Sequence, residues 1–194
     1  MNIDPLFLFV FAGLFSPGPN VILLTTSGAR FGFRATLPHL VGVVAGVGLT
    51  AGLAGAGIAA LLVARPWLEL VLKTAAAGWI LWMAWQLFLS TRRPAVAARA
   101  RPFTFFEAVL FQWINPKVWA VALAAAAGYG AGLAPQAEAL RMASAFSGIN
   151  LFVCLFWTGA GAALALLLNT PRTWQIFTTT MAAGLALAAV MVFL

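Results

Sequence analysis

Charged residues are scarce in this sequence. Only 8% of its 194 residues are Asp, Glu, Lys or Arg, and 63% are hydrophobic, whereas an ordinary soluble domain is about 25% charged. A water-soluble fold needs enough polar side chains to cover its surface, and this chain does not have them. The composition therefore excludes a soluble globule and predicts an integral membrane protein.

Cysteine and histidine are almost absent, since Cys154 and His39 are the only ones. A single thiol excludes an internal disulfide and a thiol-relay oxidoreductase, which needs two cysteines. A metal exporter or metal site should offer several His, Cys or acidic ligands within reach, and no such cluster exists. We therefore expect no catalytic residues, no bound metal and no cofactor, and we expect that the protein is not an enzyme.

The basic residues produce a net charge of +7, but they lie between apolar segments. Nucleic-acid binding would need basic patches interleaved with aromatic side chains, so no nucleic-acid partner is expected. The lipid bilayer is the expected surrounding.

Six apolar stretches are long enough to cross a bilayer as helices of about 20 residues. The sequence thus predicts an all-α integral membrane protein that forms one transmembrane domain over residues 1–194. The expected spans are Ile3 to Ser27, Leu37 to Val63, Pro66 to Ser90, Phe105 to Gly128, Ala139 to Leu168, and Trp174 to Leu194.

The connectors between these stretches predict the orientation, because Lys and Arg near helix ends favour the cytoplasmic side. Even-numbered connectors hold Arg65 and Arg141, near the acids Glu69 and Glu138. Odd-numbered connectors hold Arg30, Arg34, Arg92, Arg93, Arg99, Arg101 and Arg172. The bias places the odd connectors inside and both termini in the periplasm.

The segment STRRPAVAARARPF, Ser90 to Phe103, is the only sizeable polar insertion and falls near the middle of the chain. It separates three predicted spans from three, so a repeated fold would place its two copies upside down relative to each other. Pro19 and Pro116 occupy equivalent places in the two halves. We therefore predict two inverted three-helix repeats, residues 1–90 and 105–194, joined by a basic cytoplasmic loop at 91–104.

Prolines interrupt the first and fourth predicted spans. A proline inside a helix lacks an amide hydrogen and frees the carbonyl four residues earlier, which predicts free carbonyls at Gly13, Phe15 and Gln112. Irregular backbone at membrane depth survives only inside protein or beside a wet cavity. The expected substrate-binding residues surround these breaks: Ser16, Pro17, Gly18, Pro19, Asn20, Gln112, Asn115, Pro116 and Lys117.

Lys117 lies some twelve residues into the fourth span. A charge at that depth costs at least about 2.5 kcal/mol and usually faces the bundle interior, although a long stem can also reach toward an interface. An amino-acid zwitterion suits this site. Its carboxylate would meet Lys117 and the positive end of a restarted helix, and its ammonium would meet freed carbonyls and the amide side chains of Asn20, Asn115 or Gln112.

The motifs SPGPN, SGARFGFRATLPHLVGVVAG from Ser27 to Gly46, and QWINPK resemble the LysE-type family of bacterial amino-acid exporters, which includes the homoserine/threonine and leucine exporters. The resemblance implies a secondary transporter of the bacterial inner membrane that exports amino acids or related metabolites, is driven by the proton gradient and forms homodimers. Its motifs fall on Pro17 to Pro19 and on Gln112 and Asn115 to Lys117.

Three points stay open from the residues alone. No carboxylate lies mid-span to carry a proton, and the remaining candidates, Glu107, Asp4 and His39, are expected near interfaces. Asn150 and Ser147 in the fifth span either line the pathway or bond a neighbouring helix. A membrane scaffold or enzyme subunit without transport remains the alternative function.

Overall fold

The computed structural model describes residues 4–58, 66–92, 101–168 and 170–190. Throughout these segments the regular secondary structure is helical, which confirms the expected all-α class. The elements are α1 Pro5–Phe15, α2 Pro19–Phe31, α3 Phe33–Leu53, the π-helical turn η1 Ala54–Ile58, α5 Pro66–Arg92, α7 Phe105–Trp113, α8 Pro116–Gly128, α9 Pro135–Leu164 and α10 Pro171–Val190.

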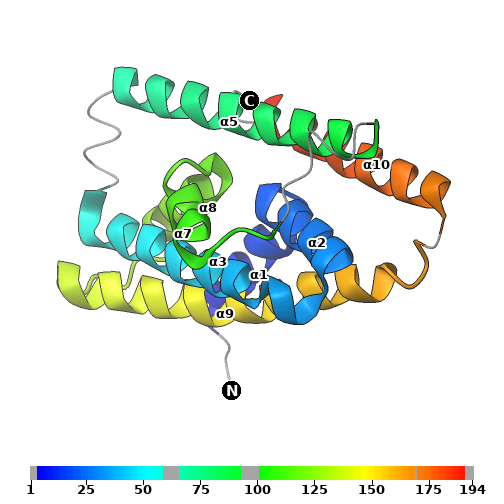
Figure 1. The fold of residues 1–194 in the computed structure, drawn as a ribbon. Coiled ribbons are helices and arrows are strands. Elements are labelled where there is room, and N and C mark those ends of the chain that lie inside the picture. The colour runs from blue at the N-terminus through cyan, green and yellow to red at the C-terminus, as the bar shows by residue number, and fades with distance from the viewer. Residues whose placement is uncertain (1–3, 59–65, 93–100, 169, 191–194) are drawn as a thin grey trace.

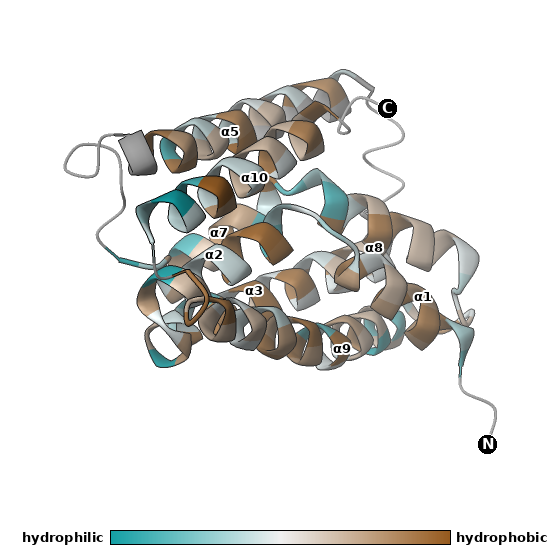
Figure 2. Cartoon of the chain, turned by 90° about the vertical axis from the view of Figure 1, so that its right-hand side faces the viewer, coloured by the Kyte–Doolittle hydropathy of each residue, from teal (hydrophilic) through white to brown (hydrophobic). Residues whose placement is uncertain are grey.

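The helices form two layers (Figure 1). Helices α5 and α10 run antiparallel as one pair, and α3 and α9 run antiparallel in the other layer, with the shorter helices α1, α2, α7 and α8 packed against them. Figure 2 shows the α5 and α10 pair side by side above the remaining helices. The connections from α2 to α3 and from α9 to α10 lie at the same end of the molecule.

Several helices are long and apolar enough to cross a membrane. They are α3 with the first residues of η1, then α9 and α10, and each of the pairs α1 with α2 and α7 with α8 if a bent pair forms one span. In α5, whose side chains are described only in part, the apolar helix identified is Ala77–Leu89. The number of six spans therefore remains a prediction.

Three helices begin earlier than the hydropathy pattern predicts. Helix α3 begins at Phe33 directly after Gly32, whose φ of 83° suits glycine and ends α2. Helices α9 and α10 begin at Pro135 and Pro171, because proline is tolerated in the first turn, where no amide hydrogen is needed. The predicted end of the second span at Val63 and most of the central basic loop lie outside the described residues.

Glycines allow several helices to approach closely. A Cβ at Gly46 would lie 2.6 Å from Cγ of Gln112, so α3 packs tightly on α7 at this point. Helices α2 and α9 cross where a Cβ on Gly28 or on Gly161 would collide with a backbone carbonyl of the opposite helix. The segment Gly42 to Gly46 thus lets α3 and α7 approach closely.

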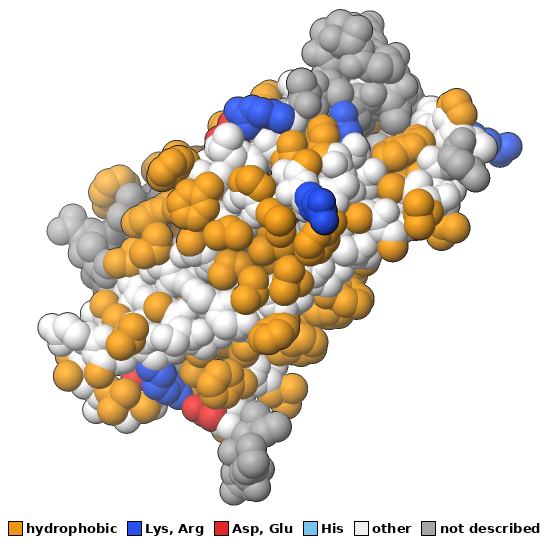
Figure 3. Space-filling view, turned by 60° about the horizontal axis from the view of Figure 1, so that its bottom comes forward, with side chains coloured by type: hydrophobic (Ala, Val, Ile, Leu, Met, Phe, Trp, Pro, Cys, Tyr) orange, Lys and Arg blue, Asp and Glu red, His pale blue; other side chains and the backbone are white. Residues whose placement is uncertain are grey.

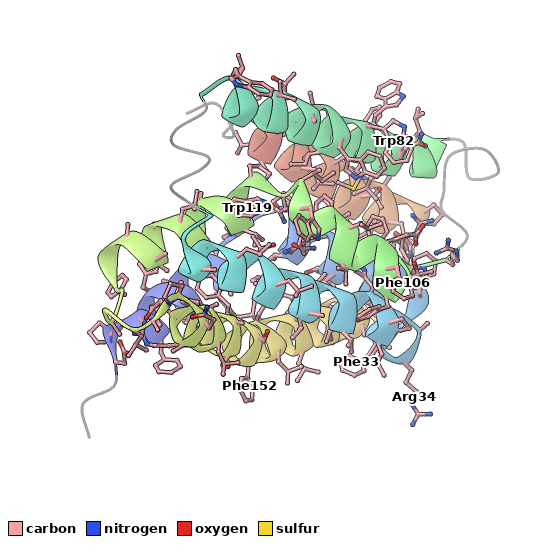
Figure 4. All side chains as sticks on the ribbon, turned by 90° about the vertical axis from the view of Figure 1, so that its left-hand side faces the viewer. Phe33, Arg34, Trp82, Phe106, Trp119 and Phe152 are labelled. Atoms are coloured by element: carbon pink, nitrogen blue, oxygen red, sulfur yellow. The ribbon has the colours of Figure 1, made fainter. Side chains whose placement is uncertain are left out.

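The outer surface is apolar, as a bilayer requires. Figure 3 shows orange side chains spread over the whole face between white atoms of other side chains and the backbone, with few charged groups. Phe152 on α9 and Phe106 on α7 are 71% and 74% exposed, and Phe152 points away from the molecule in Figure 4. Exposed aromatic side chains of this kind are compatible with contact to lipid rather than to water.

Charged side chains secure two helix ends. Arg141 pairs with Asp4 at 3.0 Å and with Glu138 at 2.9 Å, which joins the start of α1 to the start of α9. Thr104 and Glu107 form a capping box at the start of α7, and Arg101 pairs with Glu107 at 2.8 Å. Asp4 and Glu107 therefore lie at helix starts, and their expected place near interfaces stays a prediction.

Candidate functional site

The first break separates α1 from α2 by an extended turn, Ser16 to Gly18, and bends the pair by 59°. The Ser16 amide still donates to the carbonyl of Ala12, and the Ser16 hydroxyl donates to the carbonyl of Gly13 at 2.9 Å. Pro19 then begins α2. The prediction that Gly13 has a free carbonyl is wrong, because the neighbouring serine side chain bonds to it.

The second break, at Ile114 and Asn115, bends α7 and α8 by 62°. The Asn115 amide donates to the carbonyl of Gln112 at 3.2 Å, and Pro116 begins α8. The Gln112 carbonyl is therefore also occupied, contrary to the prediction. A tightened final turn uses it before the helix restarts.

Lys117 joins the two breaks. Its ammonium donates to the backbone carbonyl and the hydroxyl of Ser16, the latter at 2.9 Å, and to the carbonyl of Pro17 at 3.2 Å. Gly18 makes room for this side chain, since a Cβ there would lie 2.6 Å from Cδ of Lys117. Lys117 is half-buried, and its side chain reaches across to the break between α1 and α2.

An amide network connects the breaks beside Lys117. Asn20 Nδ2 donates to Gln112 Oε1 at 2.8 Å, and Gln112 Nε2 donates to Asn20 Oδ1 at 3.2 Å. Asn115 Nδ2 donates to Gln112 Oε1 at 3.3 Å. Gln112 and Asn115 are 0% and 1% exposed, so this polar cluster lies in the protein interior. The structure thus brings together the predicted residues of both breaks, and Pro19 and Pro116 shape it as the first residues of the restarted helices.

A small cavity of about 20 Å³ lies at these breaks. Space for a single water takes about 10–15 Å³ in the same measure, so the cavity holds one water and no larger solute in this conformation. Side chains and backbone of α1, α2, α8, α9 and the breaks line it: Leu14, Gly18, Asn20, Val21, Leu24, Asn115, Lys117, Val118, Asn150, Val153, Cys154 and Trp157.

Three polar atoms of the cavity residues have no hydrogen-bond partner within the described chain. They are Oδ1 of Asn115, Nδ2 of Asn150 and Nε1 of Trp157, and all three are buried. Buried polar groups in proteins are nearly always bonded, so each exception needs an explanation. One acceptor and two donors around one space can bind both ends of a zwitterion.

Among the cavity residues with a polar side-chain atom or a thiol, Trp157 and Cys154 were not predicted from the sequence, and Asn150 was left open. A mid-span asparagine is a visible polar signal, but an interior tryptophan resembles any other apolar residue in a span. Ser147, one turn from Asn150, donates instead to the carbonyl of Val44 on α3 at 3.4 Å. The two residues therefore divide the alternatives: Asn150 lines the cavity and Ser147 bonds a neighbouring helix.

His39 is buried inside the helix bundle, and its expected place near an interface stays a prediction. It is 1% exposed, and its Nδ1 is 3.2 Å from the hydroxyl of Ser27 on α2. Its ring packs edge-on against Phe103, with ring centres 5.0 Å apart. His39 lies in the second turn of α3, not at the helix entrance, because the helix starts at Phe33.

Comparison with known proteins is consistent with this arrangement. A model of the LysE type translocators matches residues 11–194. The chain belongs to the LysE type translocator family. Members of this family are membrane transporters, not enzymes, which agrees with the apolar helices and the interrupted spans.

Two similar relatives within this LysE type family carry the same name. The cysteine/O-acetylserine efflux protein of Salmonella typhimurium is 31% identical over 154 residues, which cover 78% of this chain and 74% of the relative. The protein of that name from Escherichia coli is 30% identical over 152 residues, with the same coverage. No solved structure matches the chain.

Proposed function

We propose that this LysE type translocator exports a small zwitterionic amino acid, or a closely related metabolite, from the bacterial cytoplasm across the inner membrane. The observation that carries the proposal is a set of polar atoms without a partner among the described residues, on Asn115, Asn150 and Trp157, around one cavity between two broken helices. The names of the two relatives make cysteine and O-acetylserine the first solutes to test.

The polar groups suggest how such a solute binds. Lys117 is at the start of α8, where the helix dipole is positive, so a carboxylate is favoured beside it. Oδ1 of Asn115 accepts a hydrogen bond and suits the solute ammonium. Nδ2 of Asn150 and Nε1 of Trp157 are donors for a carboxylate or ester oxygen. The solute's bonds replace those that the empty site leaves unmade.

The predicted repeat supports a transport mechanism by alternating access. The two breaks bend by similar angles, 59° and 62°, and each is followed by a helix that begins with proline. We propose that residues 1–90 and 105–194 are inverted repeats of one transmembrane domain, that both termini are periplasmic, and that the protein forms a homodimer. Interrupted helices from two inverted halves commonly form a midplane site.

Proton coupling is part of the proposal on the basis of the family resemblance alone. The described carboxylates of Asp4, Glu107 and Glu138 lie at helix starts, so none is positioned mid-span as a proton carrier. Efflux from loaded vesicles should fall when a protonophore collapses the pH gradient. Unchanged efflux would show that the protein transports the solute without proton coupling.

The test of the site uses Asn150→Ala in vesicles loaded with cysteine, O-acetylserine or other amino acids. Removing a buried donor that lacks a partner should leave the melting temperature unchanged or raise it, because a desolvation cost disappears. Efflux should nevertheless fall roughly tenfold, the equivalent of one hydrogen bond to the solute. Lys117→Ala should also abolish efflux, but it frees the carbonyls of Ser16 and Pro17 and so reports on folding as well.

Ser147→Ala is the matched control, since it removes a polar group one turn away on the same helix. Its weak bond to Val44 lies outside the cavity, so efflux should stay at the wild-type level. Equal efflux by the wild type, Asn150→Ala and Ser147→Ala would overturn the proposed site. No efflux of any amino acid by the wild type would favour the alternative, a scaffold or enzyme subunit that does not transport.

A further inference from the structure

A second and larger cavity, of about 110 Å³, lies between α2, α5 and the segment before α7. Its volume is several times the roughly 10–15 Å³ needed for one water, so it can admit a small solute, whereas the small cavity at the helix breaks cannot. Its lining includes two arginines and three other polar residues on a largely apolar wall: Leu23, Thr26, Ser27, Arg30, Phe31, Trp82, Met83, Gln86, Leu87, Arg101, Pro102 and Phe103.

The two arginines of this pocket differ in what they bind. The Arg101 guanidinium donates to both carboxylate oxygens of Glu107, at 2.8 and 3.2 Å. Arg30 is half-buried and packs over the Phe31 ring, with 5.4 Å from its guanidinium carbon to the ring centre, and it has no carboxylate partner in the described chain. Arg30 therefore supplies a cation and a planar fork of donors that no carboxylate among the described residues uses.

Thr26 adds an independent observation. Its side chain is 6% exposed, and its hydroxyl has no hydrogen-bond partner among the described residues although it lines the pocket. A buried threonine in a helix can bond to the carbonyl of the preceding turn, as Thr50 does with Gly46 at 3.0 Å. Within the described part of the chain, the Thr26 hydroxyl has no partner and Arg30 has no carboxylate partner, so together they form a donor set for an anionic group.

Helix α2 lines both cavities with different faces. Leu23, Thr26, Ser27 and Arg30 follow the three- and four-residue spacing of one helix face and line the larger pocket, while Asn20, Val21 and Leu24 line the midplane cavity. Asn20 and Thr26 are six residues apart, or about 9 Å along the helix. The pocket lies at the end of the molecule that the arginine bias assigns to the cytoplasm.

We propose that this pocket is a cytoplasmic loading site for the exported amino acid, distinct from the midplane site and occupied before it. The solute carboxylate binds the Arg30 guanidinium and the Thr26 hydroxyl, and its apolar part lies against Leu23, Met83 and Phe103. This inference rests on the proposed function. The phosphate of an anionic lipid shares the chemistry of the carboxylate, so the experiment must separate the two.

The test places a cysteine in the pocket, Gln86→Cys, and follows its reaction with a maleimide in vesicles of phosphatidylcholine. Wild type is the background control, because its only cysteine, Cys154, is buried. The probes are O-acetylserine and O-acetylethanolamine, which lacks the carboxylate. O-acetylserine at ten times its half-protecting concentration should slow labelling about tenfold, and O-acetylethanolamine should not.

Arg30→Gln in this background should raise the half-protecting concentration about tenfold or more, because it removes a charged donor. Thr26→Val keeps the shape of the side chain and serves as a second variant in case Arg30→Gln fails to fold. It should also raise the half-protecting concentration. Arg34→Gln is the matched control. Arg34 carries the same charge one turn further along the chain, is exposed, and points away from the molecule in Figure 4.

Two results would overturn the loading site. One is O-acetylserine protection that is absent, or equal in Arg30→Gln and Arg34→Gln. The other is protection produced by adding phosphatidylglycerol to the vesicles with no further effect of O-acetylserine, which would assign the pocket to lipid. Because labelling needs no transport, absent efflux with intact protection would defeat only the proposed function.

Discussion

At the scale of single residues, Lys117 shows how a charge is held inside the bundle. Its ammonium has three protein acceptors, two from Ser16 and one from Pro17, so it is fully bonded when no solute is present. In the proposed site, a solute carboxylate would therefore exchange with these oxygens rather than meet a bare cation. Such an exchange keeps the charge bonded in both states, which lowers the cost of placing it at membrane depth.

Asp4 provides a pH-dependent prediction outside the spans. The hydrogen bond from the Leu6 amide, and then the bond from Arg141, hold the pKa of Asp4 below its ordinary value of 3.8. A carboxylate whose pKa is lower in the folded state stabilises the fold above the unfolded pKa and loses this effect as pH falls through the folded one. Asp4→Asn should therefore melt at a lower temperature than wild type at pH 7.

The same comparison should change in acid. Between about pH 5 and pH 2 the wild-type carboxylate gains a proton, so the gap between the two melting temperatures should shrink toward zero. Asparagine still caps a helix, so the gap mainly reports the bond to Arg141. A gap that stays constant over this pH range would contradict the assignment.

At the scale of elements, the crossing of α2 and α9 depends on two glycines. A Cβ at Gly161 would collide with the carbonyl of Thr25, whereas a Cβ at Gly148 on the same helix would meet open space. Gly161→Ala should destabilise the protein by about 1–3 kcal/mol, as overpacking does. Gly148→Ala should be neutral or slightly stabilising, because alanine favours helix. Thermal unfolding in detergent measures both. Equal melting temperatures would show that α2 and α9 can move apart to accept the extra methyl group without loss of stability.

The helix breaks could be predicted from sequence because their cause is local. Proline has no amide hydrogen, so Pro17, Pro19 and Pro116 favour an interruption through their own chemistry, although Pro38 lies inside α3 without ending it. The partners of the freed groups could not be predicted in the same way. The Ser16 hydroxyl bonds to Gly13, and Lys117 reaches Ser16 from another helix, and both depend on how the chain folds around the break.

The lining of the site was predictable only in part. Asn20 and Gln112 stand out as amides in apolar text, and the structure pairs them. Trp157 carries no such signal, because its position in the cavity depends on the rotation of α9 about its own axis. That rotation is determined by the glycine crossings with α2, which join residues more than a hundred positions apart in the sequence.

At the scale of the whole molecule, charge distribution predicts the orientation. Gly32 lies in the connector after the first predicted span, and Gly132 lies in the connector after the fourth. Alkaline phosphatase, which is active only in the periplasm, should be inactive when fused at Gly32 and active when fused at Gly132, since arginines favour the cytoplasmic side. A green fluorescent protein at the same sites should give the reverse. Activity at Gly32 would invert the whole assignment.

The size of the cavity at the helix breaks has a consequence for solute entry. A space that admits one water has no room for an amino acid in this conformation. A solute enters only if its contacts are stronger in a wider conformation than in this narrow one, because a ligand shifts an equilibrium only by its difference in affinity between the two states. Recognition and opening are then a single thermodynamic event, and a molecule too weakly held to separate the helices stays on the side where it started.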